Sequence, residues 1–188
     1  VEMLEMRINS DVITRASQVE TLQELINIAD ETTHTIKKYK ALHLCILPDW
    51  DADPEQPDSR TLKHYPEQML CALSKRAWES GKRDELFPTH QIVPALQHPH
   101  KPVLMIVLSF HASSQVFGYM GLEYENANDY KVSVMLFNLM SSLANGMRIL
   151  RRKLYIEYLQ KKVEEASLYD KMTDMLSKKG LLLYLEKQ

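Results

Sequence analysis

The last third of the chain distributes apolar and polar residues at the spacing of an α-helix, and no proline follows Pro102. Apolar residues recur at intervals of three and four, which places them on one face of a helix. The pattern predicts one helix from Tyr130 to about Tyr169. So long a helix carries more apolar surface than one small domain covers, so we expect part of it to meet a partner helix in a homodimer. The residues expected at this contact are Leu143, Met147, Leu150, Leu154, Leu159 and Val163.

A second helical pattern begins near the N-terminus. Residues 1–10 have no clear periodicity and are assigned to a linker, and Asp11 supplies a side-chain acceptor for a helix start. From Val12 to Ile36 apolar residues again keep to one face. The sequence therefore predicts one long entry helix from Asp11 to about Lys38.

Between these helices the sequence has the pattern of β-strands. Ala41–Leu47 is a short apolar run that Pro48 ends, and it predicts a buried strand. Residues 68–78 fit either a strand or a helix, and the turn-like residues 79–82 favour the strand. In residues 86–96, two prolines permit only a loop with a short extended piece.

The clearest strand pair lies between residues 103 and 123. The apolar run 103–110 predicts a strand buried on both faces or nearly so, residues 111–115 a polar turn, and residues 116–123 the returning strand. Together the elements predict an α+β fold, with one antiparallel sheet flanked by long N- and C-terminal helices.

Composition narrows the class of protein. The 188 residues are 45% hydrophobic and 26% charged, as in a soluble globular protein. A net charge of −2 gives no electrostatic case for nucleic acid as a partner. No apolar run is long enough to span a membrane and no signal peptide opens the chain, so we expect a cytoplasmic protein.

Few residue patterns suggest chemistry. No metal site is expected, because the cysteines and histidines lack the spacing of metal ligands. Cys45 and Cys71 are interpreted as buried free thiols. Four histidines are interpreted as solvated loop residues: His90, His98, His100 and His111. A basic cluster is interpreted as a solvated or ion-paired face rather than an anion site, and consists of Arg148, Arg151, Arg152 and Lys153. No catalytic motif is present, so the chain is not expected to be an enzyme by itself.

Four aromatic residues could line a small-molecule pocket beside the sheet: Trp78, Phe117, Tyr119 and Tyr124. Aromatic residues in this setting also commonly belong to a core. The sequence leaves both interpretations open.

The segment after the long helix contains a family motif. Residues 170–181, DKMTDMLSKKGL, resemble the opening D-x-L-T-G-L-x-N-R-R-G-F of GGDEF domains, the diguanylate cyclase family. The matching positions include Asp170, Thr173, Lys178 and Gly180. The chain departs from the motif at Asp174 and Ser177, where the family has Gly and Asn, which puts the activity of the parent enzyme in doubt.

A wider part of the chain resembles the GAF-like sensor modules that precede GGDEF domains. The resemblance is in the order of residues 87–94, 103–110 and 117–120 and the exit helix. A PAS-type module is the alternative, although such modules usually begin with strands. The resemblance divides the chain into a GAF-like regulatory domain at 11–153, a coupling helix at 154–169 and the start of a truncated GGDEF domain at 170–188.

These resemblances imply a regulatory module of a bacterial-type signalling protein. It would dimerise and control a C-terminal diguanylate cyclase, which joins two GTP molecules into cyclic di-GMP with Mg²⁺ and would lie beyond Gln188. The fragment itself would need no cofactor. The alternative is a small-molecule-binding input domain of another output, either a histidine kinase or a transcription regulator.

Overall fold

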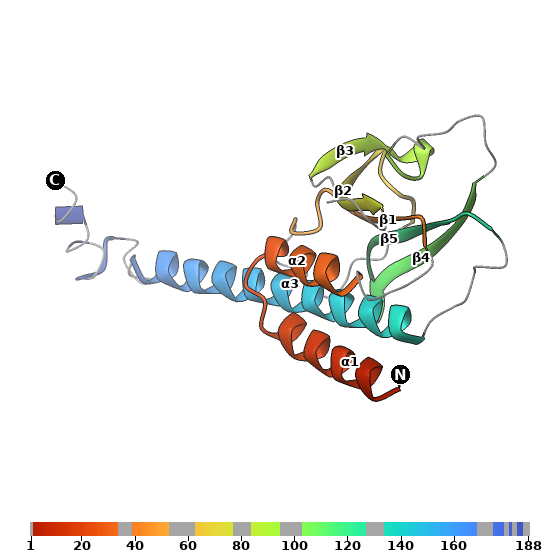
Figure 1. Cartoon of the computed structure of the whole chain (residues 1–188). Helices are drawn as coiled ribbons and strands as arrows, with labels where there is room; N and C mark the ends of the chain where they lie inside the picture. Colours follow the sequence, from red (N-terminus) through yellow and green to blue (C-terminus); the bar gives the residue numbers. More distant parts are fainter. Residues whose placement is uncertain are drawn as a thin grey trace.

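The computed structural model describes residues 2–33, 39–52, 63–76, 84–94, 103–126 and 134–168, together with 175–178, 181, 184 and 185. These residues form an α+β fold in which helices cover one face of an antiparallel sheet (Figure 1). In chain order the elements are α1 (Glu2–Ser17), α2 (Leu22–Thr33), β1 (Ala41–Ile46), β2 (Gln68–Arg76), β3 (Glu85–Pro88), the 3-10 helix η1 (Thr89–Gln91), β4 (Leu104–Ala112), β5 (Gln115–Tyr124) and α3 (Val134–Leu168).

The sheet has five strands in the order β3-β2-β1-β5-β4, and every neighbouring pair is antiparallel. The central strand β1 is buried throughout, as its continuous apolar sequence predicted. The ambiguous segment 68–78 contains the strand β2. The described part of the proline-interrupted segment 86–96 contains the end of the short β3 and the 3-10 helix η1. The β4–β5 hairpin is also confirmed.

The expectation that residues 103–110 are buried on both faces is wrong. In β4, Val107 is 49% exposed and Leu104 37% exposed. The reason is the position of the strand: β4 lies at the edge of the sheet, and its helix contacts come from α3 on one face. An apolar run alone does not distinguish a central strand from an edge strand.

The prediction of a single entry helix is also wrong, because residues 18–21 separate two helices, α1 and α2. Thr21 begins α2: its hydroxyl oxygen accepts a hydrogen bond from the backbone N–H of Glu24, at 3.2 Å. The pair has the spacing of the S/T-x-x-E pattern that marks helix starts. Residues 2–10, expected in a linker, belong to α1.

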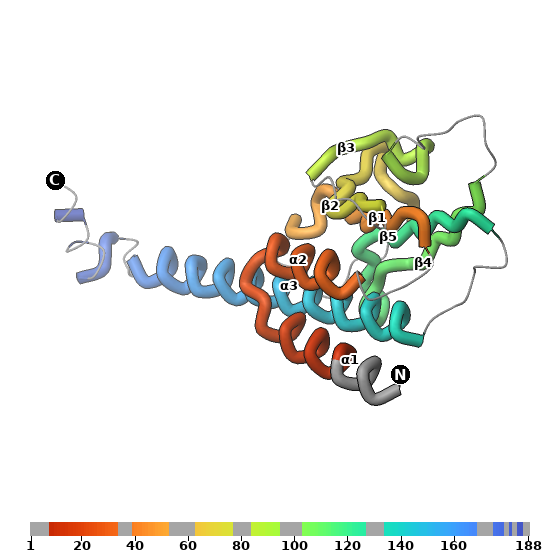
Figure 2. Tube along the Cα trace, viewed as in Figure 1, coloured from red at the N-terminus to blue at the C-terminus, as the bar shows by residue number. Residues whose placement is uncertain are grey.

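The three helices pack closely on one side of the sheet. The trace shows α1 and α3 running in the same direction and α2 in the opposite direction (Figure 2). Gly146 permits the close approach of α1 to α3, because a Cβ atom there would lie 2.5 Å from Leu25 Cδ1 and 3.0 Å from the Ala16 carbonyl oxygen. The packed helices and the sheet share one apolar core.

Gly118 fixes a second close approach, between β5 and β1. Its φ is +152°, and a Cβ atom there would overlap the carbonyl group of Cys45. Only glycine fits this position without moving the backbone of the central strand.

Candidate functional site

α3 has two halves with different surroundings. Its buried residues all lie between Met135 and Arg151, whereas from Arg152 onward its side chains are half-buried or exposed. Figure 1 shows the second half extending away from the sheet and the other helices. The helix therefore starts inside the domain and leaves it without a break.

Three basic side chains hold α3 where it leaves the domain, and we call Arg148, Arg151 and Lys153 the exit collar. The Arg151 guanidinium donates to the carbonyl oxygen of Ala52 at 3.2 Å, and Lys153 Nζ donates to the carbonyl oxygen of Val19 at 2.8 Å. Arg148 donates to the Ser113 hydroxyl oxygen at the longer distance of 3.5 Å.

The collar joins α3 to three separate segments: the loop after β1, the α1–α2 connection and the β4–β5 turn. The sequence interpretation of a solvated basic face is wrong for Arg151. Arg151 is 4% exposed, and its carbonyl partner comes from a loop 99 positions away in the chain. The local sequence contains no signal for a contact of that kind.

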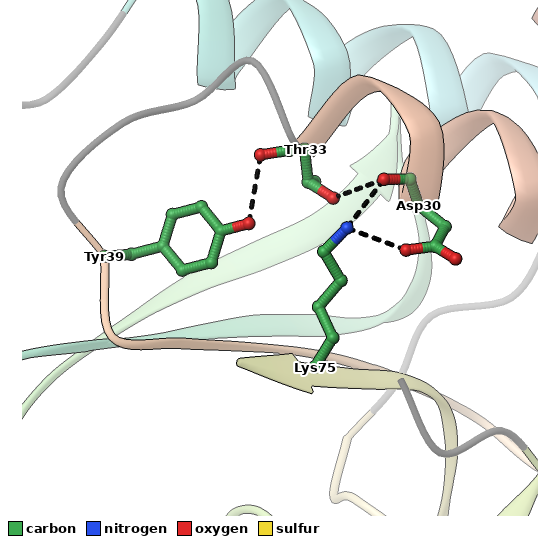
Figure 3. Close-up of polar contacts among 4 residues, drawn as sticks. All are labelled: Asp30, Thr33, Tyr39 and Lys75. Atoms are coloured by element: carbon green, nitrogen blue, oxygen red, sulfur yellow. Dashed lines mark hydrogen bonds and ion pairs between the residues drawn. The ribbon is translucent and has the colours of Figure 1, made fainter. Parts of the chain in front are cut away.

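A buried ion pair joins the sheet to α2 (Figure 3). The fully buried ammonium group of Lys75, on β2, donates to the backbone oxygen and to the carboxylate of Asp30, each at 2.7 Å. A cation is favourable here, because the C-terminal turn of a helix presents carbonyl oxygens and the negative end of the helix dipole.

Two hydroxyl groups complete this cluster. Thr33 Oγ1 donates to the Asp30 carbonyl oxygen at 2.9 Å, and Tyr39 Oη donates to the Thr33 carbonyl oxygen at 3.0 Å (Figure 3). Burial raises the pKa of the Tyr39 hydroxyl, and the Asp30 charge adds to the increase. The cluster fixes the end of α2 to β2, and α2 in turn packs on α3.

The other face of the sheet carries a polar row across three strands. His43 on β1 pairs through Nδ1 with Ser74 Oγ at 2.9 Å and through Nε2 with Glu123 Oε1 at 3.0 Å. Burial alone would lower the pKa of His43, but hydrogen bonds to Cys71 and Glu123 outweigh it and raise the pKa. The His43 ring in turn lowers the pKa of the Glu123 carboxyl. The pair therefore favours the charged form of both groups.

Cys45 and Cys71 are buried free thiols, as the sequence predicted, and they face each other across β1 and β2. The hydrogen bond to Cys71, with burial, raises the pKa of Cys45; the same hydrogen bond and the nearby His43 lower the pKa of Cys71. They belong to a second apolar cluster with Phe87, Val93 and Tyr119. This cluster covers part of the sheet face that the helices leave open.

Three of the four aromatic residues that could have lined a pocket lie in the apolar cores instead. Phe117 and Tyr124 lie in the core shared with the helices, and Tyr119 lies in the second cluster, where its hydroxyl donates to the Ile92 carbonyl oxygen. All three are buried, which corresponds to the core interpretation. Trp78 lies outside the described residues.

The expected dimer residues also separate into two groups. Leu143, Met147 and Leu150 are buried within the chain itself, so the expectation that they meet a partner is corrected. They lie on the side of α3 that packs on the domain core. Leu154 is half-buried, whereas Leu159 is 42% and Val163 68% exposed.

The segment that resembles a GGDEF start is described only in part. Lys178 is exposed, and Asp170, Thr173 and Gly180 lie outside the described residues. The backbone N–H of Ser177 donates to the Leu168 carbonyl oxygen at 2.7 Å, and its hydroxyl donates to the Ser167 carbonyl oxygen at 2.7 Å. Ser177 therefore lies against the last turn of α3.

Sequence reasoning missed four polar residues that the fold brings into buried polar contacts: His43, Ser74, Glu123 and Lys75. Only His43 is a single polar residue inside an otherwise apolar segment, and this interruption was the available signal. Among the described residues, no group of three or more histidine, cysteine or acidic side chains is arranged to hold a metal ion.

Comparisons with protein-family models, with curated proteins and with solved structures found no match to the chain. In the part of the chain that the structure describes, no helix combines the length and apolar character needed to cross a membrane.

Proposed function

We propose that this chain is a GAF-like regulatory module that acts as a homodimer and controls a C-terminal diguanylate cyclase through α3. The observation that carries the proposal is the path of α3, which begins in the core of the domain, passes the exit collar and continues as an exposed helix. The resemblance of residues 170–181 to a GGDEF start supports a cyclase as the attached domain.

The contacts of α3 suit a relay. Lys75 and Asp30 connect the sheet to α2, α2 packs on α3, and the collar connects three loops to α3 at its exit. A change in the sheet domain can therefore shift or rotate the helix as a rigid rod. Two GTP molecules must meet for cyclic di-GMP to form, so a rotation of paired helices would set the distance between two catalytic domains. Since GTP is an intracellular substrate, we place the module in the cytoplasm.

The test is an insertion series in the longer protein that carries the cyclase. Two residues inserted after Glu157 rotate the rest of the helix by about 200°, whereas seven residues restore the phase to within about 20°. We expect the seven-residue insertion to keep more than half of the cyclic di-GMP formation from GTP and the two-residue insertion to change it at least tenfold. Equal rates in the native protein and both variants would reject the relay.

A small-molecule input is the second candidate, and the polar row favours it. His43, Ser74 and Glu123 place hydrogen-bonding groups in a largely buried position on the sheet face opposite the helices. A ligand that binds there would stabilise the folded chain, so its melting temperature would rise with ligand concentration. A Glu123→Gln variant should lose that rise, and a rise of equal size in the variant would place the ligand elsewhere.

A further inference from the structure

Two cysteines lie directly opposite each other in the middle of the sheet. Cys45 on the central strand β1 is the register partner of Cys71 on β2, and both side chains are buried in the second apolar cluster. Residues opposite each other on antiparallel strands have Cα atoms about 4.5–5.5 Å apart, within the range of about 4.4–6.8 Å that a disulfide spans. The two free thiols therefore have the backbone geometry of a cross-strand disulfide.

The two thiols differ in reactivity. The hydrogen bond to Cys45, together with the nearby His43, outweighs burial and lowers the pKa of Cys71 to about 6. The same hydrogen bond and burial raise the pKa of Cys45, so this thiol stays protonated. Because the thiolate is the nucleophilic form of cysteine, Cys71 is the attacking sulfur. Cys45 is then placed to react with whatever forms on Cys71.

The polar row supports the thiolate form of Cys71. His43 is held on both sides, since its ring nitrogens pair with Ser74 Oγ at 2.9 Å and with Glu123 Oε1 at 3.0 Å. Burial lowers the pKa of His43, but hydrogen bonds to Cys71 and Glu123 outweigh it. A protonated histidine beside a cysteine stabilises the thiolate. The row therefore keeps a cationic ring next to Cys71.

A short segment at the edge of the sheet packs against the thiols. It places Phe87 of β3 and Val93, which follows η1, in one cluster with Tyr119 and the two cysteines. Ile92 in this segment has a φ of +65°, a conformation that a β-branched residue rarely adopts, and the Tyr119 hydroxyl donates to its carbonyl oxygen. A four-residue edge strand followed by a strained turn opens at a lower cost than the central strands. Such an opening admits a molecule as small as hydrogen peroxide.

We propose that Cys45 and Cys71 form a redox site, which a hydroperoxide oxidises to an intramolecular disulfide. The Cys71 thiolate attacks one peroxide oxygen and breaks the O–O bond, which leaves a sulfenic acid on Cys71. The other oxygen of hydrogen peroxide takes up a proton and departs as water. The Cys45 thiol then displaces the sulfenic hydroxyl as a second water, and the sulfur–sulfur bond forms. This inference depends neither on the attached cyclase nor on the dimer.

Mass spectrometry of the reduced chain after treatment with hydrogen peroxide tests the site. We expect a single-chain product lighter by two hydrogen atoms, in which the peptides of Cys45 and Cys71 are joined, and dithiothreitol should restore the original mass by exchange. Cys45→Ser and Cys71→Ser are the matched variants. Cys45→Ser should stop at a sulfenic acid that dimedone traps, whereas Cys71→Ser should react at least tenfold more slowly.

Three results would overturn the inference: both thiols open to alkylation in denaturant after peroxide treatment, a disulfide that joins two chains, or equal rates in the two serine variants. If a variant fails to fold, the joined peptides of the native chain decide the question. His43→Gln should slow disulfide formation at least tenfold. An unchanged rate in this variant would overturn the assigned activation of Cys71 by the polar row.

Discussion

Buried polar residues are the most informative positions for mutation, because the structure gives each of them defined hydrogen-bond partners. His43, Lys75 and Arg151 are all buried, and each joins segments that lie far apart in the chain. A buried charge that loses its partner keeps the full cost of its desolvation. Changes at these positions should therefore report on the links between the sheet, the helices and the exit of α3.

The Glu123–His43 pair gives a prediction with a defined pH dependence. The pKa of Glu123 is lowered, so its contribution to stability is present above the ordinary value of 4.5 and lost as the pH falls through the folded value. The pKa of His43 is raised, so its contribution is complete below the ordinary value of 6.5 and is lost as the pH rises through the folded value. The pair thus contributes most between these two values.

Glu123→Gln should accordingly lower the free energy of unfolding by about 1–3 kcal/mol near pH 5.5 and by clearly less near pH 8.5. Urea unfolding at the two pH values measures the difference. Glu125→Gln, a change of an exposed carboxylate on the same stretch, is the control and should have little effect at either pH. A loss that is the same at both pH values would contradict the assigned pair.

Lys75→Met should destabilise the chain by about 2–4 kcal/mol, because it leaves Asp30 and the end of α2 without their cation. Adding Asp30→Asn should recover part of this loss, since the carboxylate charge that Lys75 offsets is then removed. Denaturant unfolding of the two single variants and the double variant gives the coupling free energy. Strictly additive losses would show that the two residues do not stabilise each other.

None of these pairs could be predicted from sequence. Each requires the strand register: His43 lies opposite Ser74 on one side and near Glu123 on the other only because of the β2-β1-β5 order. The burial of Cys45 and Cys71 was predictable, because both lie in apolar segments. Their pairing across two strands was not.

At the scale of elements, periodicity was most reliable where it was longest. The helix expected from Tyr130 to about Tyr169 is α3, described from Val134 to Leu168, and the hairpin strands are close to their expected bounds. The break between α1 and α2 was missed because apolar spacing continues across residues 18–21, although Thr21 and Glu24 carried a start signal. Apolar periodicity shows which side of a helix or strand is apolar, but it does not show which other element packs on that side.

A leucine-to-glutamate substitution should destabilise the fold strongly on the buried face of α3 and only weakly on its exposed face. Leu150→Glu places a charge in the core and should cost about 3–5 kcal/mol of folding free energy. Leu159→Glu changes an exposed position and should cost less than about 1 kcal/mol in the folded domain. Urea unfolding at low protein concentration compares them, and losses of equal size would contradict the assignment of the two faces.

For the whole molecule, the sequence predicted the α+β class and the antiparallel sheet between helices. The resemblance placed the exit of the long helix from the domain after residue 153, but the sequence did not predict the contacts of the exit collar, because these depend on loops brought together by the fold. This exit of α3 is the basis of the functional account. One half of the helix belongs to the domain, and the other half is available to a second copy.

Sedimentation equilibrium of the chain, compared with the double variant Leu159→Glu/Val163→Glu, tests this account most directly. The account predicts twice the mass of one chain for the native protein. For the variant it predicts the mass of a single chain, with an unchanged far-ultraviolet circular dichroism spectrum. A native chain that sediments as a monomer, or a variant that remains fully dimeric, would contradict it.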